Sequence, residues 1–192
     1  MNSRFLDSIL TTILVLVSVS ASAQTLRDSL FAETDAALEA ARTADAATLA
    51  PRSFERGMKA YASAEEALER GRNVETVRKR LTEARERFEE STETATTSKL
   101  TLQVTLETRE DAQKADAPTL SGPIWEDAEK KLADAIRVLE RGDLRNGRRN
   151  AAESESLYRD AELGAIKTRY LSETRRLLSE AARAKVGRFA PL

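Results

Sequence analysis

Apolar side chains recur along this chain at the spacing of an α-helix. Phe54, Tyr61 and Leu68 lie seven residues apart, which places them on one stripe of a helix. The same spacing returns about 71 residues later, at Trp125, Leu132 and Leu139. A further series follows the three- and four-residue steps of a coiled-coil contact: Val74, Val77, Leu81, Ala84 and Phe88. The hydrophobic pattern therefore predicts a chain made of helices.

The chain also repeats its sequence with a period of about 71 residues. Residues 44–71 align with residues 115–142 without a gap and share 13 identities in 28 positions. Both segments open on ADA and close on LERG. Arg72 has no counterpart in the second copy of the repeat, and after it the two copies align at an offset of 70 residues. A fixed period of this length indicates modules that stack on one another.

Turn residues divide each repeat into three helices. Gly71 and Gly142 suit the left-handed end of a helix, Asn73 and Asp143 can cap the helix that follows, and Pro51 marks the other turn. The sequence predicts an all-α fold of two antiparallel three-helix units joined by long continuous helices, in a spectrin-like or coiled-coil-like rod. The expected helices span residues 26–46, 51–70 and 74–95 in the first unit and 96–116, 123–141 and 144–165 in the second.

The repeat sets the expected domain boundaries. No helix stop signal occurs between Val74 and Ala117, so one long helix should close the first unit and open the second. We assign residues 24–95 to helical unit 1 and residues 96–165 to helical unit 2. Residues 166–192 would begin an incomplete third unit, because the final RFAPL resembles the entry to the second helix of each unit.

Three features test this interpretation. Residues 99–108 alternate apolar and polar side chains, the period of a half-buried strand. Their counterpart in the next unit does not alternate and is rich in helix formers, so we predict helix in both. Gly147 and Gly164 each cost about 1 kcal/mol relative to alanine inside a helix, and we expect local opening in unit 2 first. Trp125 should pack in the core, with an exposed contact point for a partner as the alternative.

The first 23 residues have the pattern of a secretory signal peptide. Arg4 supplies a weak positive start, residues 9–19 supply an apolar run, and ASA at 21–23 has the small-x-small form of a cleavage site. An uncleaved anchor is the alternative, since residues 8–26 contain no charge and approach the roughly 20 residues that span a bilayer. The Thr, Ser and Gln side chains of this segment favour cleavage after Ala23, and hence a periplasmic protein with no integral membrane span.

The residue inventory excludes most catalytic chemistry. The chain contains no histidine and no cysteine, which removes the commonest general base, thiolate nucleophiles and the usual zinc ligands. Without cysteine there is also no lipobox for N-terminal lipidation and no disulfide. The many glutamates are interleaved with arginines at three- and four-residue spacing, the pattern of a solvated helix face. We therefore expect no enzyme, no cofactor and no metal site.

Charge points to one candidate interaction surface. The chain has 31 basic and 32 acidic residues, and this balance gives no reason to expect nucleic acid as a partner. The one locally basic stretch surrounds GDLRNGRR, which has glycines at phosphate-loop spacing but lacks the Lys-Ser/Thr pair and follows a helix. We define the basic patch as Arg137, Arg141, Arg145, Arg148 and Arg149. The pattern favours a solvated helix start, and the alternative is a site for an anionic polymer or a lipid headgroup.

With the repeats aligned, the mature chain resembles the helical N-terminal region of bacterial OmpA-family envelope proteins, often classed as a domain of unknown function. The likeness rests on APRSFERGMKAYASAEEALERG, GPIWEDAEKKLADAIRVLERGDL and AAESESLYRDAELGAIKTRYLSETRRLL. In such proteins the helical units precede a C-terminal OmpA-like domain that binds peptidoglycan. The present sequence lacks that domain, so the resemblance implies neither peptidoglycan binding nor a catalytic residue.

These observations predict a non-enzymatic helical scaffold or spacer of the bacterial cell envelope. It would contact envelope proteins or cell-wall components through the sides of a semi-rigid rod, and homo-oligomerisation stays open. The alternative is a periplasmic binding module, either a holdase or a binder of anionic polymers, that uses inter-helix grooves and the basic patch.

Overall fold

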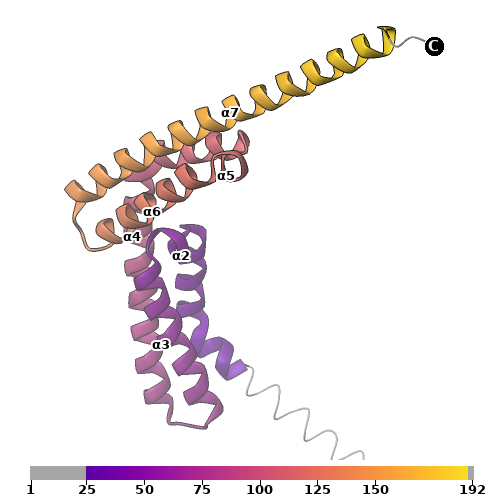
Figure 1. Ribbon diagram of the computed structural model, residues 1–192. Coiled ribbons are helices and arrows are strands. Elements are labelled where there is room, and N and C mark those ends of the chain that lie inside the picture. The colour runs from indigo at the N-terminus through magenta and orange to yellow at the C-terminus, as the bar shows by residue number, and fades with distance from the viewer. Residues whose placement is uncertain (1–24, 190–192) are drawn as a thin grey trace, which may run out of the picture. The chain divides into compact units, whose positions relative to one another are not determined.

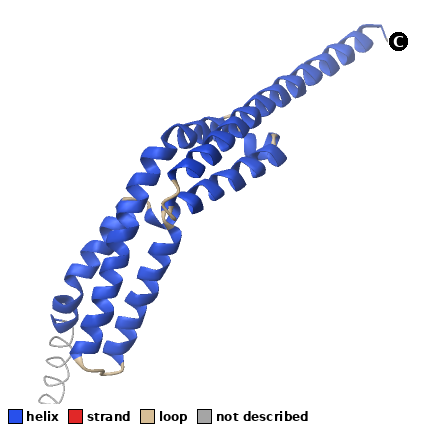
Figure 2. Cartoon of the chain, turned by 90° about the vertical axis from the view of Figure 1, so that its left-hand side faces the viewer, coloured by secondary structure: helices blue, strands red, loops and turns tan. Residues whose placement is uncertain are grey.

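The computed structural model describes residues 25–189, apart from the side chains of residues 185–189. Its first helix covers residues 25–43. The others are α2 (Ala46–Leu49), α3 (Pro51–Glu69), α4 (Val74–Lys114), α5 (Ala117–Leu120), α6 (Gly122–Leu139) and α7 (Leu144–Phe189) (Figure 1). Residues 25–189 contain no strand (Figure 2), so the all-α prediction is confirmed. The expected signal peptide, residues 1–23, lies outside the described residues.

The stretch with strand-like alternation is helical, as predicted. Residues 99–108 lie within α4. Leu102 is fully buried, whereas Leu100 and Val104 are 74% and 54% exposed. Residues two positions apart lie on different faces of a helix, so these alternating apolar side chains do not form one buried surface.

The chain divides into two compact units between Ala95 and Thr96. Unit 1 combines helix 25–43, α2, α3 and the first part of α4, whereas unit 2 combines the second part of α4 with α5, α6 and α7. α4 runs through the boundary without interruption. One helix therefore serves as the last helix of unit 1 and the first helix of unit 2.

The first turn of each unit accounts for the repeated ADA sequence. The first helices end earlier than the expected residues 46 and 116, at residues 43 and 114. Asp45 and Asp116 then adopt left-handed backbone conformations, with φ of 57° and 66°, which aspartate tolerates better than most residues. The chain continues into α2 or α5, each only four residues long.

The second turn of each unit follows the sequence prediction. Gly71 and Gly142 have φ of 62° and 81°, as expected at a left-handed helix end. Asn73 and Asp143 cap the next helix, because the backbone amide three residues later donates to their side-chain oxygen at 2.8 Å and 3.0 Å. Each cap satisfies an amide group that has no partner inside the helix.

An aromatic cluster fills the core of unit 1. Phe31 on the first helix meets Tyr61 on α3 edge to face, with 5.4 Å between ring centroids, and Tyr61 lies 6.4 Å from Phe88 on α4. Such pairs contribute about 0.5–1.5 kcal/mol beyond the area they bury. Thr34 Oγ1 ties the first helix to α4 by donating to the Leu81 carbonyl oxygen at 3.3 Å.

Unit 2 repeats this arrangement with other side chains. Trp125 on α6 is partly buried and packs against Tyr158 on α7, with 5.1 Å between ring centroids. Thr105 Oγ1 donates to the Ala151 carbonyl oxygen at 3.2 Å, which is the counterpart of the bond made by Thr34. Two threonines at equivalent positions of the repeat thus make the same tertiary hydrogen bond.

The last helix of each unit is buried in the same way. Residues 71–95 and 141–165 have the same order of buried, half-buried and exposed positions, residue for residue. The side chains at the buried positions differ, since unit 1 has Val77 where unit 2 has Gly147. The repeat therefore extends from the sequence to the tertiary packing.

Gly147 in α7 makes room for a neighbouring leucine. A Cβ atom at this position would lie 2.3 Å from a methyl carbon of Leu139, and Leu139 is buried. The corresponding pair in unit 1 is Val77 and Leu68, of which Leu68 is only half-buried. The glycine that costs helix propensity therefore allows Leu139 to be buried more deeply than the corresponding Leu68. The expected early opening of unit 2 stays a prediction.

Gly57 makes a similar close contact in unit 1, where a Cβ atom would lie 2.7 Å from two ring carbons of the fully buried Phe88. Alanine is favoured over glycine in a helix by about 1 kcal/mol, but overpacking a close-packed core typically costs about 1–3 kcal/mol. We expect overpacking to dominate, so that Gly57→Ala lowers the free energy of unfolding measured by urea denaturation and circular dichroism.

The control is Gly57→Ala in a Phe88→Leu background. Leucine is smaller than the aromatic ring and can turn its branched end away from the new methyl group, so the second substitution should cost less there. A wild-type chain stabilised by Gly57→Ala would contradict the close contact.

Candidate interaction surfaces

The structure places the basic patch at the turn between α6 and α7. Arg137 lies in the last turn of α6, Arg141 lies in the connecting turn, and the other three arginines lie in the first two turns of α7. All five side chains are exposed. The patch therefore occupies one end of unit 2.

Neighbouring acids neutralise part of the basic patch. Arg137 pairs with Asp134, and Arg149 Nε lies 3.9 Å from a carboxylate oxygen of Glu153. The other three arginines of the patch make no ion pair with the residues that the structure describes. These three guanidinium groups are the part of the patch that an anionic ligand can use.

Asp143 lies within the basic patch as the N-cap of α7. Its carboxylate accepts hydrogen bonds from the side chain and the backbone amide of Asn146. These bonds, with a smaller contribution from Arg141 and Arg149, hold the pKa of Asp143 below its usual value. Because this carboxylate stays ionised, it reduces the attraction that the patch exerts on an anion.

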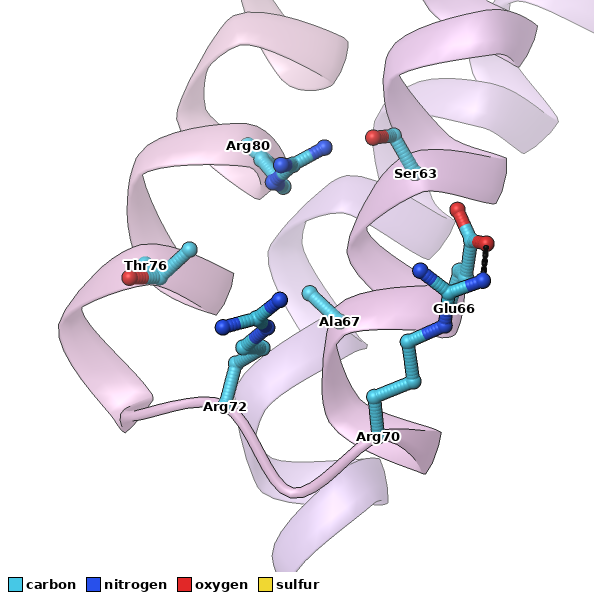
Figure 3. Close-up of a pocket in the computed structure, with 7 residues that line it drawn as sticks. All are labelled: Ser63, Glu66, Ala67, Arg70, Arg72, Thr76 and Arg80. Carbon is cyan, nitrogen blue, oxygen red and sulfur yellow. Dashed lines mark ion pairs between the residues drawn. The ribbon is translucent and has the colours of Figure 1, made fainter.

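The corresponding end of unit 1 has a different charge pattern. Glu66 and Glu75 occupy the positions of Arg137 and Arg145, whereas the other three positions of the patch are basic in unit 1 as well, as Arg70, Arg78 and Lys79. The repeat therefore keeps only part of the basic patch. This end of unit 1 instead contains a cavity of about 300 Å³ (Figure 3). Its lining residues come from α3, the turn and α4: Ser63, Glu66, Ala67, Arg70, Arg72, Thr76 and Arg80.

Arginines dominate the cavity of unit 1. Arg70 Nη2 pairs with Glu66 at 2.6 Å, whereas Arg72 and Arg80 extend toward the space between the turn, α3 and α4 (Figure 3). Neither Arg72 nor Arg80 makes an ion pair with the described residues. Two guanidinium groups without carboxylate partners suit a small anionic group such as a phosphate or a carboxylate.

Sequence reasoning missed this cavity. Arg72 falls in the gap of the repeat alignment, and the residue of unit 2 that corresponds to Arg80 is Asn150. The available signal was the extra arginine itself, because a one-residue insertion at the turn between two aligned helices changes the side chains at that end of the unit.

A polar cluster links the first helix to α3 in unit 1. Arg27 Nη2 donates to Glu65 Oε1 at 2.9 Å and to Tyr61 Oη at 3.2 Å, and Tyr61 Oη donates to Asp35 Oδ1 at 2.5 Å. The Arg27 guanidinium also lies 4.6 Å from the centroid of the Phe31 ring, a cation–π geometry. Burial, together with the hydrogen bond to Asp35, raises the pKa of Tyr61 to about 12.

A second polar cluster joins three helices in unit 2. Arg109 Nε and Tyr158 Oη both donate to Glu129 Oε1 at 2.6 Å, and the guanidinium lies 5.4 Å from the centroid of the Trp125 ring. Burial, together with the hydrogen bond to Glu129, raises the pKa of the Tyr158 phenol. Arg109 occupies the position of the buried Leu38 of unit 1. Unit 2 thus has a charged side chain at this position, and the carboxylate of Glu129 pairs with it.

Neither polar cluster contains the elements of a metal centre. Within the described residues, no group of three or more acidic side chains is arranged to hold a metal ion. None of the described helices has the length and apolar character needed to cross a membrane. Comparisons with protein-family models, with curated proteins and with solved structures found no match.

The two buried phenols predict weaker folding at alkaline pH. Folding raises the pKa of Tyr61 and of Tyr158 above the ~10 of a free tyrosine, so the native state keeps protons that the unfolded chain releases. The free energy of unfolding should therefore fall as the pH rises above ~10 and toward the folded pKa of Tyr61, about 12. Urea denaturation at several pH values measures this fall.

The matched variant is Tyr61→Phe with Tyr158→Phe. It should be less stable than the wild type at neutral pH, because it loses the hydrogen bonds to Asp35 and Glu129. Its additional loss of stability above pH ~10 should be smaller. An equal alkaline loss in both chains would show that the two phenols titrate normally in the folded state.

Proposed function

We propose that this chain is a non-enzymatic helical scaffold or spacer that contacts other components through the sides of its helices. The observation that supports this most is the repeat in three dimensions. Residues 71–95 and 141–165 share their buried positions, and Thr34 and Thr105 make equivalent hydrogen bonds. Repeated units that keep one core and differ at the surface provide several contact surfaces on one support.

The chemistry of the exposed surfaces fits a contact role. Sites for small substrates are mostly apolar pockets with a few polar groups, whereas the cavity of unit 1 is lined mainly by charged and hydroxyl side chains. The absence of histidine and cysteine from the sequence also favours a role that does not require general-base or thiolate chemistry.

We also propose that this scaffold works in the bacterial periplasm. The pattern of residues 1–23 supports export, and the resemblance to OmpA-family proteins supports a place in the cell envelope. The proposed partners are envelope proteins or cell-wall components.

A second candidate function is binding of an anionic polymer. Its support is the set of guanidinium groups without ion pairs among the described residues, in the basic patch and at Arg72 and Arg80. Such groups attract phosphates and carboxylates over distances set by the salt concentration.

Affinity capture from bacterial envelope extracts tests the scaffold role. The bait is the full chain purified from the periplasm of a bacterial host, where it should begin at Gln24. It should enrich the same few proteins from independent extracts, and contacts between helix faces should persist at about 0.5 M NaCl because apolar contacts are not screened. An unrelated helical protein of similar net charge is the control. Enrichment of nothing beyond that control, or a chain retained with Met1, would contradict the proposal.

Titration with polyphosphate tests the second function. Its affinity should fall steeply as salt increases, and Arg148→Glu with Arg149→Glu should weaken binding at least about tenfold in low salt. Arg72→Glu with Arg80→Glu measures the contribution of the cavity in unit 1. Arg42→Glu with Arg52→Glu makes the same charge change elsewhere, and equal weakening by this pair would indicate general charge attraction without a site.

A further inference from the structure

The second half of α7 exposes an apolar stripe. Every position from residue 166 to residue 184 is exposed, beyond the buried Ala165. Figure 1 shows this half of α7 continuing past α5 without another helix beside it. The large apolar side chains of the stripe are 52% to 68% exposed: Tyr170, Leu171, Leu177 and Leu178. We name residues 166–184 the α7 extension.

The α7 extension has the side-chain pattern whose members are buried in the first helix of each unit. Four of its positions match unit 1 at an offset of 140, one residue less than the repeat offsets of the preceding helices give, so the pattern is shifted by one residue along α7. These positions are Leu171, Thr174, Leu178 and Ala181. The aligned residues of unit 1 are all buried: Phe31, Thr34, Leu38 and Ala41. Those of unit 2 are buried or half-buried: Leu102, Thr105, Arg109 and Ala112. The threonine and the alanine occur in all three segments, so the extension has the side chains of a helix that packs against others.

α4 shows what covers a helix with this pattern. Residues 74–95 of α4 pack within unit 1, and residues 96–114 then become the first helix of unit 2. There, Thr105 bonds to α7 and Arg109 bonds to α6. α7 has the same order, because residues 144–165 pack within unit 2 and the α7 extension follows. By analogy with residues 96–114 of α4, which two helices cover, we expect two further helices to pack against the α7 extension.

The side chain of Thr174 forms the hydrogen bond that is typical of a threonine on an exposed helix. Thr34 and Thr105 donate to a carbonyl oxygen of another helix, whereas Thr174 Oγ1 donates to the Tyr170 carbonyl oxygen of its own helix at 2.8 Å. An exposed helical threonine typically bonds to the carbonyl oxygen four residues before it, as Thr101 also does. The Thr174 hydroxyl is therefore free to donate its hydrogen bond to a main-chain carbonyl oxygen of a partner helix instead.

Charge distinguishes between occupants of the α7 extension. The extension contains five basic and two acidic residues, so pairing with the same segment of a second copy would bring like charges together. Lys167 falls at the position of Arg27 in unit 1, whose guanidinium pairs with Glu65 of α3 at 2.9 Å. A partner with a carboxylate at the corresponding position would complement Lys167.

We propose that the α7 extension docks an antiparallel pair of helices from a partner protein and so completes a third three-helix unit. The partner presents an apolar stripe to Leu171 and Leu178, a main-chain carbonyl to Thr174 and a carboxylate to Lys167. A basic amphipathic helix also suits an anionic lipid surface, but lipid makes no use of a threonine and an alanine at the positions of Thr34 and Ala41. The proposal rests on the proposed scaffold role and specifies one partner by its chemistry.

Two peptides from this chain serve as probes of the docking surface, because each contains a helical pair that covers a first helix in the structure. They comprise residues 46–95 and residues 115–165. Each is titrated into the full chain while hydrogen-exchange mass spectrometry follows the amides of the α7 extension. Docking of either peptide should slow their exchange at least about tenfold, and calorimetry should show one peptide bound per chain.

Leu171→Glu with Leu178→Glu should abolish both effects, because it places charge on the docking face. The matched control is Ser172→Glu with Ser179→Glu, which makes the same charge change one residue further along, about 100° round the helix from each leucine. This control should bind the peptides as the wild type does. Equal loss of binding in both variants would mean that charge alone, and not the apolar face, determines binding.

Three other results would overturn the proposal. Unchanged exchange with both peptides would mean that the α7 extension does not accept a helical pair. Slower exchange with phosphatidylglycerol vesicles but not with the peptides would assign the extension to a lipid surface. Slower exchange at higher protein concentration without a probe would assign it to a second copy. Because purified components are used throughout, these outcomes are independent of the capture experiment for the scaffold role.

Discussion

Both units depend on small side chains that allow their helices to approach closely. More than half of the buried apolar side chains are alanine, and each unit has a glycine in direct contact with a large side chain of another helix, Phe88 in unit 1 and Leu139 in unit 2. Such a core buries little apolar area per residue, so each aromatic ring and each tertiary hydrogen bond provides a larger share of the stability. Substitutions at the close contacts therefore affect the fold more than their size suggests.

The fold was largely predictable from the sequence because local signals and packing agree. Helical spacing, the glycines at positions 71 and 142 and the caps at positions 73 and 143 all favour the same helices and turns, and the structure has them. The left-handed conformations of Asp45 and Asp116 were not predicted. An aspartate in a repeated ADA sequence is compatible with several turns, and only the packing of α2 and α5 selects one.

The polar contacts of the units were less predictable, because they require knowledge of neighbours in space. Arg109 falls on a stripe that is apolar in unit 1, and its place in the core depends on Glu129 from α6 and Tyr158 from α7. Arg72, which lines the cavity, lies between Gly71 and the capping Asn73, whereas no residue separates Gly142 from Asp143 in unit 2. The two units thus have the same core packing but different groups at the equivalent end. Arginines line a cavity in unit 1 and form an exposed cluster in unit 2.

The passage of α4 through the boundary has a thermodynamic consequence. Starting a helix is the unfavourable step of its formation, and each further residue adds a hydrogen bond to an existing end. Because α4 belongs to both units, this unfavourable step occurs once. Two separate helices would each require it. Melting of one unit would leave a fraying helix end on the other, so the continuous backbone of α4 makes the unfolding of the two units partly cooperative.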